Sequence, residues 1–234
     1  QGHEELAKWL NELRDLAVAV NKDEAERLGI PQSTAVTCVK PSGTVSQLVG
    51  VSSGMHAWHS DFYVRTVRGD NKDPITQFMK DSGIPSEPDV RNPENTTVFS
   101  FPQRAPEGSI TRRDLSAIEH LELWLTYQRE WCEHKPSVTI SVKESEWDEV
   151  GEWVWEHFDE CSGVSFLPLD DHTYEQAPYQ DCTQEFFDEL SSKVPTIDWS
   201  DLSFYETNDE AVAGSQTLAC SGATGCESVD LVSQ

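Results

Sequence analysis

The sequence predicts an α/β protein in which strands and helices alternate along the chain. Apolar residues at three- and four-residue steps indicate helices, and short runs that alternate apolar with polar side chains indicate strands. The two patterns follow one another without internal repeats, which is typical of α/β folds. The 234 residues are enough for one large domain or two small ones with a hydrophobic core.

The first expected element is a helix over residues 4–29. Its apolar residues recur at helical spacing with charged residues between them, and they are Leu6, Trp9, Leu10, Leu13, Leu16, Ala17 and Val20. The run Gly29-Ile30-Pro31 ends this helix, because proline cannot continue it and glycine favours its C-terminus.

The remaining elements follow in order along the chain. We expect strands at residues 35–39, 62–67, 96–101, 137–142 and 164–167, and helices at 76–82, 111–133, 146–160 and 183–193. Thr111 and Asp114 have the spacing of a capping box, which places the start of the long helix at Thr111. A turn at Pro41–Thr44 leads into residues 45–49.

The chain is divided by composition near Pro195. Residues 1–194 form the expected folded portion, and residues 195–234 lose apolar density and become rich in Asp, Glu, Ser and Gly. A segment of this composition at a chain end is typical of a mobile tail.

The charge of the chain is strongly negative. Asp and Glu number 42 against 17 Lys and Arg, which gives a formal charge of −25, and the mean hydropathy is −0.54. Eight Trp and nine Phe argue against a disordered acidic chain. Such a field repels nucleic-acid backbones, so binding of duplexes by the whole surface is excluded, whereas a local pocket for a small anion is not. The acid excess also fits a protein that stays soluble at high salt.

Neither a membrane span nor a secreted disulfide framework is expected. The longest uncharged stretch, Pro41–Ser60, is rich in Ser, Gly and His, whereas a span needs ~20 mostly apolar residues. Residues 1–16 carry charges throughout, unlike a signal peptide. The six cysteines are scattered along the chain, so we expect a reducing cytoplasm.

The segment Thr37–Gln47 has the chemistry of an anion-binding turn. A predicted strand leads into a turn in which Gly43 allows close approach of a ligand, and Ser42, Thr44 and Ser46 offer hydroxyl groups. Backbone N–H groups from Val45 onward add further donors. The alternative is an ordinary connection between a strand and a helix, and spacing alone leaves both open.

Two histidines and two arginines follow this turn. His56 and His59 have a spacing that metal ligands can take, but no second Cys or His pair lies near them, so hydrogen-bonded structural histidines are the better interpretation. Arg65 and Arg68 stand out in so acidic a chain. They are either salt-bridge anchors or contacts to an anionic ligand, and the sequence leaves both open.

The tail carries a pair of cysteines with small residues between them. Cys220 and Cys226 enclose Ser-Gly-Ala-Thr-Gly, a spacer that can close an unstrained disulfide ring. A thiol pair on a polar C-terminal segment suggests redox exchange, and the alternative is two idle thiols. His172 lies in an Asp-x-His-x-x motif whose closing Gly is replaced by Glu175, so we interpret it as structural.

Several segments together resemble the C-terminal part of adenosylcobalamin-dependent (class II) ribonucleotide reductases. They are TCVKPSGTVSQLVG at 37–50, SGMHAWHSDFYVRTVRGDNKDP at 53–74, TVFSFPQRAP at 97–106, LELWLTYQREWCEHKPSVTISV at 121–142, VSFLPLDDHTYEQAPYQ at 164–180 and the terminal LACSGATGC. The likeness extends over nearly the whole chain and is strongest to the monomeric kind that reduces ribonucleoside triphosphates.

The resemblance implies a ten-stranded α/β barrel and a set of roles. The substrate phosphates would be held at Ser42, Gly43, Thr44, Val45 and Ser46. Adenosylcobalamin would contact residues of about 54–115, including His56, His59, Arg65 and Arg68, and of about 174–213. Cys220 and Cys226 would be the shuttle pair that reduces the active-site disulfide and is recharged by thioredoxin.

The sequence also departs from that family. It contains no Asn-Pro-Cys-Gly-Glu loop, which in the family carries the radical cysteine, and it begins with Gln1 in what reads as mid-helix. We therefore expect a fragment that is inactive alone and that needs the missing N-terminal part of a reductase for deoxyribonucleotide synthesis. Two alternatives stay open, the large subunit of an oxygen-dependent (class I) reductase acting on diphosphates, and a non-catalytic acidic interaction domain.

Overall fold

The computed structural model describes residues 2–43, 45–169 and 175–206. The chain divides into two compact units, and each is assembled from two separate segments. Unit 1 consists of residues 1–58 and 108–171, and unit 2 consists of residues 59–107 and 172–234. The expected continuous portion 1–194 is thus split between two units, because contacts link segments that are distant in the sequence.

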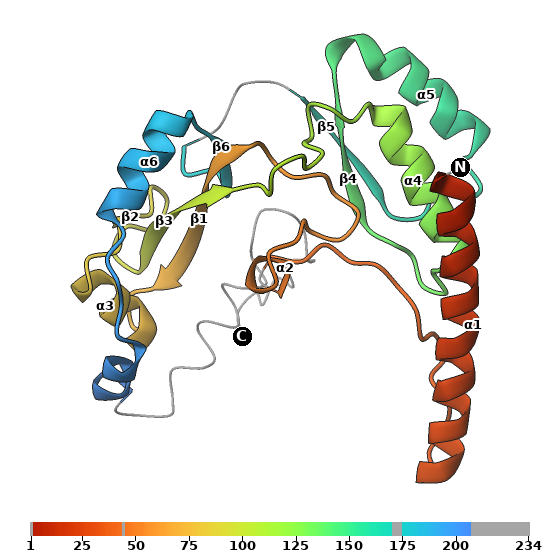
Figure 1. Cartoon of the computed structure of the whole chain (residues 1–234), viewed down its shortest axis with the longest axis horizontal. Coiled ribbons are helices and arrows are strands. Elements are labelled where there is room, and N and C mark those ends of the chain that lie inside the picture. Colours follow the sequence, from red (N-terminus) through yellow and green to blue (C-terminus); the bar gives the residue numbers. More distant parts are fainter. Residues whose placement is uncertain (1, 44, 170–174, 207–234) are drawn as a thin grey trace, which may run out of the picture. The chain divides into compact units, whose positions relative to one another are not determined.

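Unit 1 is a small parallel sheet covered by helices (Figure 1). Its strands β4 (Val138–Val142) and β5 (Val164–Pro168) pair in parallel, with Val138 opposite Val164. The other elements of the unit are α1 (Gly2–Leu28), α2 (Val45–Leu48), α4 (Ala117–Glu130), the 3₁₀ turn η1 (Glu144–Glu146) and α5 (Trp147–Glu156). Helix α4 packs against α1, β4 and α5.

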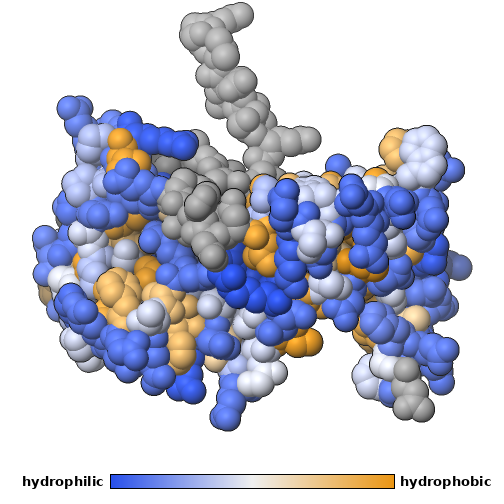
Figure 2. Space-filling view, turned by 90° about the horizontal axis from the view of Figure 1, so that it is seen from above, coloured by the Kyte–Doolittle hydropathy of each residue, from blue (hydrophilic) through white to orange (hydrophobic). Residues whose placement is uncertain are grey.

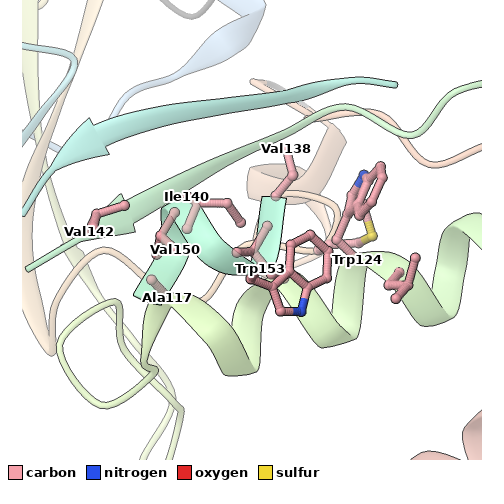
Figure 3. Close-up of a cluster of buried hydrophobic side chains, with 10 residues drawn as sticks. Ala117, Trp124, Val138, Ile140, Val142, Val150 and Trp153 are labelled. Atoms are coloured by element: carbon pink, nitrogen blue, oxygen red, sulfur yellow. The ribbon is translucent and has the colours of Figure 1, made fainter. Parts of the chain in front are cut away.

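The core of unit 1 is formed by β4 together with the helices α4 and α5. Trp124 from α4 and Ile140 from β4 are fully buried, and Trp153 from α5 joins them (Figure 3). The pattern of β4, in which buried and half-buried residues alternate, is that of a strand with one face on the core. The two indole N–H groups also have partners, since Trp124 Nε1 donates to Pro136 O at 3.2 Å and Trp153 Nε1 donates to Glu122 Oε1 at 2.6 Å.

Unit 2 is an antiparallel sheet with strand order β2-β3-β1-β6. Its strands are β1 (Phe62–Asp70), β2 (Ser86–Pro88), β3 (Thr96–Arg104) and β6 (Tyr179–Asp181). Helices α3 (Pro74–Asp81) and α6 (Gln184–Lys193) pack against it. The molecule is therefore a mixed α/β protein, and its largest sheet is antiparallel rather than parallel.

The long helix α4 begins later than predicted. The capping box is made by Ser116 and Glu119, and not by Thr111 and Asp114. Thr111 does bond Asp114 Oδ2 through its N–H and hydroxyl at 2.9 and 2.7 Å. However, a β-bridge between Trp58 and Thr111 holds this segment extended, so the prediction of the helix start was wrong.

Other differences from the predicted elements are smaller. Residues 35–39 do not form a strand of a sheet, and residues 45–48 form the short helix α2. Strands β2 and β6 and the 3₁₀ turn η2 (Trp199–Phe204) were not predicted, because three-residue strands and single turns leave almost no periodic signal.

Ordered contacts continue beyond Pro195. Trp199 and Tyr205 place their rings 5.6 and 5.5 Å from the ring of Phe78 in α3. The Tyr205 hydroxyl donates to Asp81 Oδ2 at 3.0 Å. The expected start of the tail therefore differs from the structure, in which the chain packs on α3 as far as Tyr205.

The surface is largely hydrophilic, with scattered apolar patches (Figure 2). The most exposed large apolar side chains are Leu48, Trp155 and Phe204. Among the helices of the described residues, none is both long enough and apolar enough to cross a membrane.

Candidate functional site

The predicted anion-binding turn lies in unit 1 at the start of α2. The Ser42 hydroxyl accepts the Ser46 N–H at 3.0 Å, so Ser42 caps this short helix. The Ser46 hydroxyl donates to Ser42 O at 2.9 Å, and Ser46 is buried. These reciprocal bonds close the turn, and they use the Ser46 hydroxyl internally.

A second loop, at residues 53–54, is hydrogen-bonded to the turn and packs closely against it. Ser53 Oγ accepts the Ser42 N–H at 2.7 Å. Gly54 follows with a positive φ of 58°, and a Cβ at this position would lie 2.9 Å from Lys40 O. Only glycine permits so close an approach in this conformation. The loop at residues 53–54 therefore determines the path of the chain from Lys40 to Ser42.

Part of the turn lies at the surface. Gly43 and Val45 are exposed, and Ser42 is half-buried. A hydroxyl can accept one hydrogen bond and still donate its own proton, so Ser42 keeps a donor while it caps α2. Of the five residues predicted to hold phosphates, Thr44 lies outside the described residues.

His56 is a structural histidine that joins three parts of unit 1. Its Nδ1 lies 2.7 Å from Ser53 O, and its Nε2 accepts the Thr139 N–H at 3.0 Å, which requires the neutral ring with the proton on Nδ1. The ring of His120 in α4 packs edge-on at 5.8 Å, and His120 Nε2 donates to Met55 O at 3.0 Å. Burial lowers the pKa of His56, and burial with the neighbouring His56 lowers that of His120 to about 4.

The other predicted histidine, His59, lies in unit 2 within an aromatic cluster. Its Nε2 is 2.8 Å from Asp181 Oδ1 in β6. Its ring stacks on Tyr179 at 5.3 Å and meets Tyr63 edge-on at 5.7 Å. Burial raises the pKa of Tyr63 to about 12, so this phenol keeps its proton at neutral pH.

The two arginines of β1 have different surroundings. The Arg65 guanidinium lies 4.4 Å from the centre of the Tyr179 ring and donates to Pro178 O at 3.2 Å. Arg68 is a salt-bridge anchor, with Nε 2.8 Å from Asp89 Oδ2 and a further bond to Gln176 O. Burial by itself would raise the pKa of Asp89, but hydrogen bonds from Arg68 and two backbone N–H groups lower it.

Unit 2 brings together the two segments predicted to contact cobalamin. Strand β1 comes from the first segment and β6 from the second, and Arg65 pairs with Tyr179 across them. At this sheet edge the half-buried Tyr179 ring contacts His59 and Arg65, and Tyr63 is buried. Aromatic and polar side chains of this kind can contact a large cofactor with a planar ring and amide side chains. Within the described ranges, no group of three or more His, Cys, Asp or Glu side chains is arranged to hold a metal ion.

The cysteines of the predicted redox pair, Cys220 and Cys226, and the predicted structural residue His172 lie outside the described residues. The cysteines that the structure does describe, namely Cys38, Cys132, Cys161 and Cys182, are free thiols and half-buried.

Sequence reasoning did not identify four residues that shape these sites. Ser53 and Gly54 follow the predicted motif, and no local signal marks their contacts with Ser42 and Lys40, which lie 11 and 14 residues earlier. Tyr179 and Asp181 belong to a strand too short to predict, and only the pairing of β6 with β1 places them beside His59 and Arg65.

No family model matches the chain, but individual relatives do. An adenosylcobalamin-dependent ribonucleoside-triphosphate reductase of Euglena gracilis is 32% identical over 196 residues, which is 83% of this chain and 27% of that protein. One from Lactobacillus acidophilus is 28% identical over 94% of this chain and 29% of its own length. The crystal structure of a B12-dependent (class II) ribonucleotide reductase aligns with a TM-score of 0.71 and 26% identity, over 89% of this chain and 30% of that one.

This chain is therefore similar to these relatives both in sequence and in fold, over part of the length of each relative. The chain spans between a quarter and a third of the length of the curated relatives it matches. Over that span, this protein is a homologue of the adenosylcobalamin-dependent (class II) ribonucleotide reductases.

Proposed function

We propose that this chain is a working part of an adenosylcobalamin-dependent ribonucleoside-triphosphate reductase. In such an enzyme the ribose 2′-hydroxyl is replaced by hydrogen, and the deoxyribonucleotide serves DNA synthesis. The observation that carries the proposal is 32% identity over 196 residues with a reductase of that name, together with a matching fold. The class I subunit and the acidic interaction domain have no comparable support.

The turn at residues 42–46 is the proposed grip on the substrate phosphates. Its Gly43 and Val45 are exposed, and the Ser42 hydroxyl can donate. The Ser46 N–H is already used by Ser42, so Ser46 contributes by holding the turn. Free backbone N–H groups of a turn can bind an anion.

The cofactor proposed for unit 2 is adenosylcobalamin, as the names of the relatives suggest. Arg65, Tyr179 and His59 would form part of its wall, whereas Arg68 is bonded to Asp89 and Gln176. His56 acts indirectly, by fixing the loop that supports the phosphate turn. When bound, cobalamin supplies the radical that starts the reaction.

The rest of the reductase must supply the radical cysteine loop, which this sequence lacks. We propose that the chain forms the C-terminal part of a ten-stranded barrel with that missing portion, and that it does not turn over alone. Residues beyond Tyr205 would form the acidic tail. A reducing cytoplasm is the proposed location, in keeping with the free thiols of the described residues.

The phosphate turn is tested by replacing both of its donor hydroxyls in the assembled reductase. Ser42→Ala with Thr44→Ala should raise KM for the nucleoside triphosphate tenfold or more, because each charge-assisted hydrogen bond contributes ~1.5–3 kcal/mol. Ser33→Ala, an exposed serine elsewhere in unit 1, serves as the matched control. An unchanged KM in a double variant with a normal circular dichroism spectrum would contradict the role of the turn.

The tail pair is tested by its dependence on the reductant. Replacing Cys220 and Cys226 with Ser should abolish repeated turnover with thioredoxin, because disulfide exchange needs one attacking and one resolving thiol. The first turnover of pre-reduced enzyme should remain, and dithiothreitol should restore cycling because it diffuses to the buried disulfide. Product per enzyme is measured with both reductants. Wild-type cycling with thioredoxin in the double variant would rule out the shuttle.

A further inference from the structure

In unit 2, the 3₁₀ turn η2 packs against α3 and leaves a pocket beside it (Figure 1). The rings of Trp199 and Tyr205 lie 5.6 and 5.5 Å from the buried ring of Phe78. The Tyr205 hydroxyl donates to Asp81 Oδ2 at 3.0 Å, so a polar contact joins the two elements as well. The open pocket has a volume of about 500 Å³ and is lined by Phe78, Asp81, Ser82, Asp201, Phe204 and Tyr205.

The pocket combines aromatic rings with two carboxylates. Asp81 is the last residue of α3 and Asp201 belongs to η2, so the two negative charges come from different elements. Both act on the same phenol, because the hydrogen bond to Asp81 and the charges of Asp81 and Asp201 raise the pKa of Tyr205. Such an effect of a charge requires a short distance. Both carboxylates therefore lie near the Tyr205 hydroxyl.

The negative charge of the pocket has no counter-charge within the part of the chain that the structure describes. There, neither Asp81 nor Asp201 forms an ion pair with a Lys, Arg or His side chain. Lys80 precedes Asp81 in the sequence, but it does not line the pocket. The C-terminal end of a helix carries a partial negative charge, and α3 ends at Asp81. The pocket therefore favours a positively charged ligand.

We propose that this pocket binds a small aliphatic diamine or polyamine. An ammonium group is attracted by carboxylates and by the face of an aromatic ring. Two carboxylates balance the charge of two ammonium groups, and the Phe204 ring, which is 77% exposed, offers apolar surface to the methylene groups between them. None of the lining residues belongs to the phosphate turn or to the proposed cobalamin wall, so this binding site does not rest on the proposed function.

The test is calorimetric titration of the chain with cadaverine (pentane-1,5-diamine) in KCl at about physiological ionic strength, which weakens unspecific attraction to the acidic surface. Pentane-1,5-diol, which has the same carbon chain without charge, is titrated in parallel and should not bind. Asp81→Asn with Asp201→Asn should weaken cadaverine binding about tenfold or more, because two charge-assisted contacts are lost. Asn at position 81 can still accept the Tyr205 hydroxyl, so the contact between α3 and η2 is kept.

A matched pair of substitutions separates the pocket from the general charge of the chain. Asp148→Asn with Asp159→Asn removes the same two charges from exposed positions of unit 1 and should leave the affinity unchanged. Phe204→Ala changes an exposed side chain and should weaken binding about two- to fivefold, through the lost contact between ammonium group and ring. Absence of binding by the wild-type chain, equal losses in the two Asp pairs, an unchanged affinity in Phe204→Ala, or equal binding of the diol would each overturn the proposal.

Discussion

The backbone packs closely against Gly163, the residue that directly precedes β5. The Gly163 carbonyl accepts the Val138 N–H at 3.0 Å, and a Cβ on Gly163 would meet the Pro136 carbonyl oxygen. Gly163→Ala should therefore lower the free energy of unfolding by ~1–3 kcal/mol, because the backbone of both strands must shift. Urea unfolding followed by tryptophan fluorescence measures the effect.

The control for this prediction is a glycine in the same unit with free space around it. No atom lies within 4 Å of a Cβ built on Gly151 in α5, so Gly151→Ala should stabilise the chain by ~0.5–1 kcal/mol through helix propensity. Equal urea midpoints for the two variants would show that the contact at Gly163 is not tight.

The residue types predicted the kind of role that a side chain has better than they predicted its contact partners. The interpretation of His56 as a hydrogen-bonded structural histidine is consistent with its two partners in the structure. For Arg65 and Arg68 the sequence offered two interpretations. The structure pairs Arg68 with Asp89 and places Arg65 on Tyr179, because the partners come from segments 21 and 114 positions away.

At the scale of elements, His56 and His120 connect the loop at residues 53–55, next to the proposed phosphate turn, to α4 and β4. Both rings are neutral in the fold and have a lowered pKa, and that of His120 falls from 6.5 to about 4. The unfolded chain therefore binds more protons than the folded chain between pH 6.5 and about 4. Stability is greatest above that window and is lost as the pH falls through it.

This proton linkage predicts a measurable dependence of the free energy of unfolding on pH. Between pH 7.5 and 5.5, His120 alone should lower the free energy of unfolding by ~1 kcal/mol. The urea midpoint of the wild type is compared with that of His120→Asn in the same buffers, so that carboxylate effects cancel. The variant should lose less stability on acidification, and parallel slopes for the two proteins would contradict the neutral, buried state of His120.

The start of α4 shows how a local sequence pattern can predict the wrong boundary of a helix. Thr111 and Asp114 have the spacing of a capping box, and the Thr111 N–H does donate to Asp114 Oδ2. Yet the Arg112 N–H donates to Trp58 O at 2.8 Å, and this long-range pairing keeps the segment extended until Ser116 begins α4. Helices α1 and α6 began and ended close to the predicted residues, because no such distant partner competes with their periodicity.

For the whole molecule, the charge of −25 determines the response to salt. Like charges spread over 234 residues repel each other, and the Debye length is ~10 Å at 0.1 M salt and ~3 Å at 1 M. Added KCl should therefore raise Tm, since the compact state suffers the stronger repulsion. Melting curves from low to high KCl measure this, and a flat or falling Tm would count against the argument.

The sequence by itself determined the positions of most helices and long strands, the likeness to class II reductases and the residue types of the proposed phosphate turn. These depend on periodicity, composition and short motifs, which are local properties. Only the tertiary structure decided that two pairs of distant segments form two units, that β6 brings Tyr179 and Asp181 to His59, and that His56 bonds the Thr139 N–H. Such contacts depend on strand pairing and packing between residues about a hundred positions apart, and no local pattern encodes which partners meet.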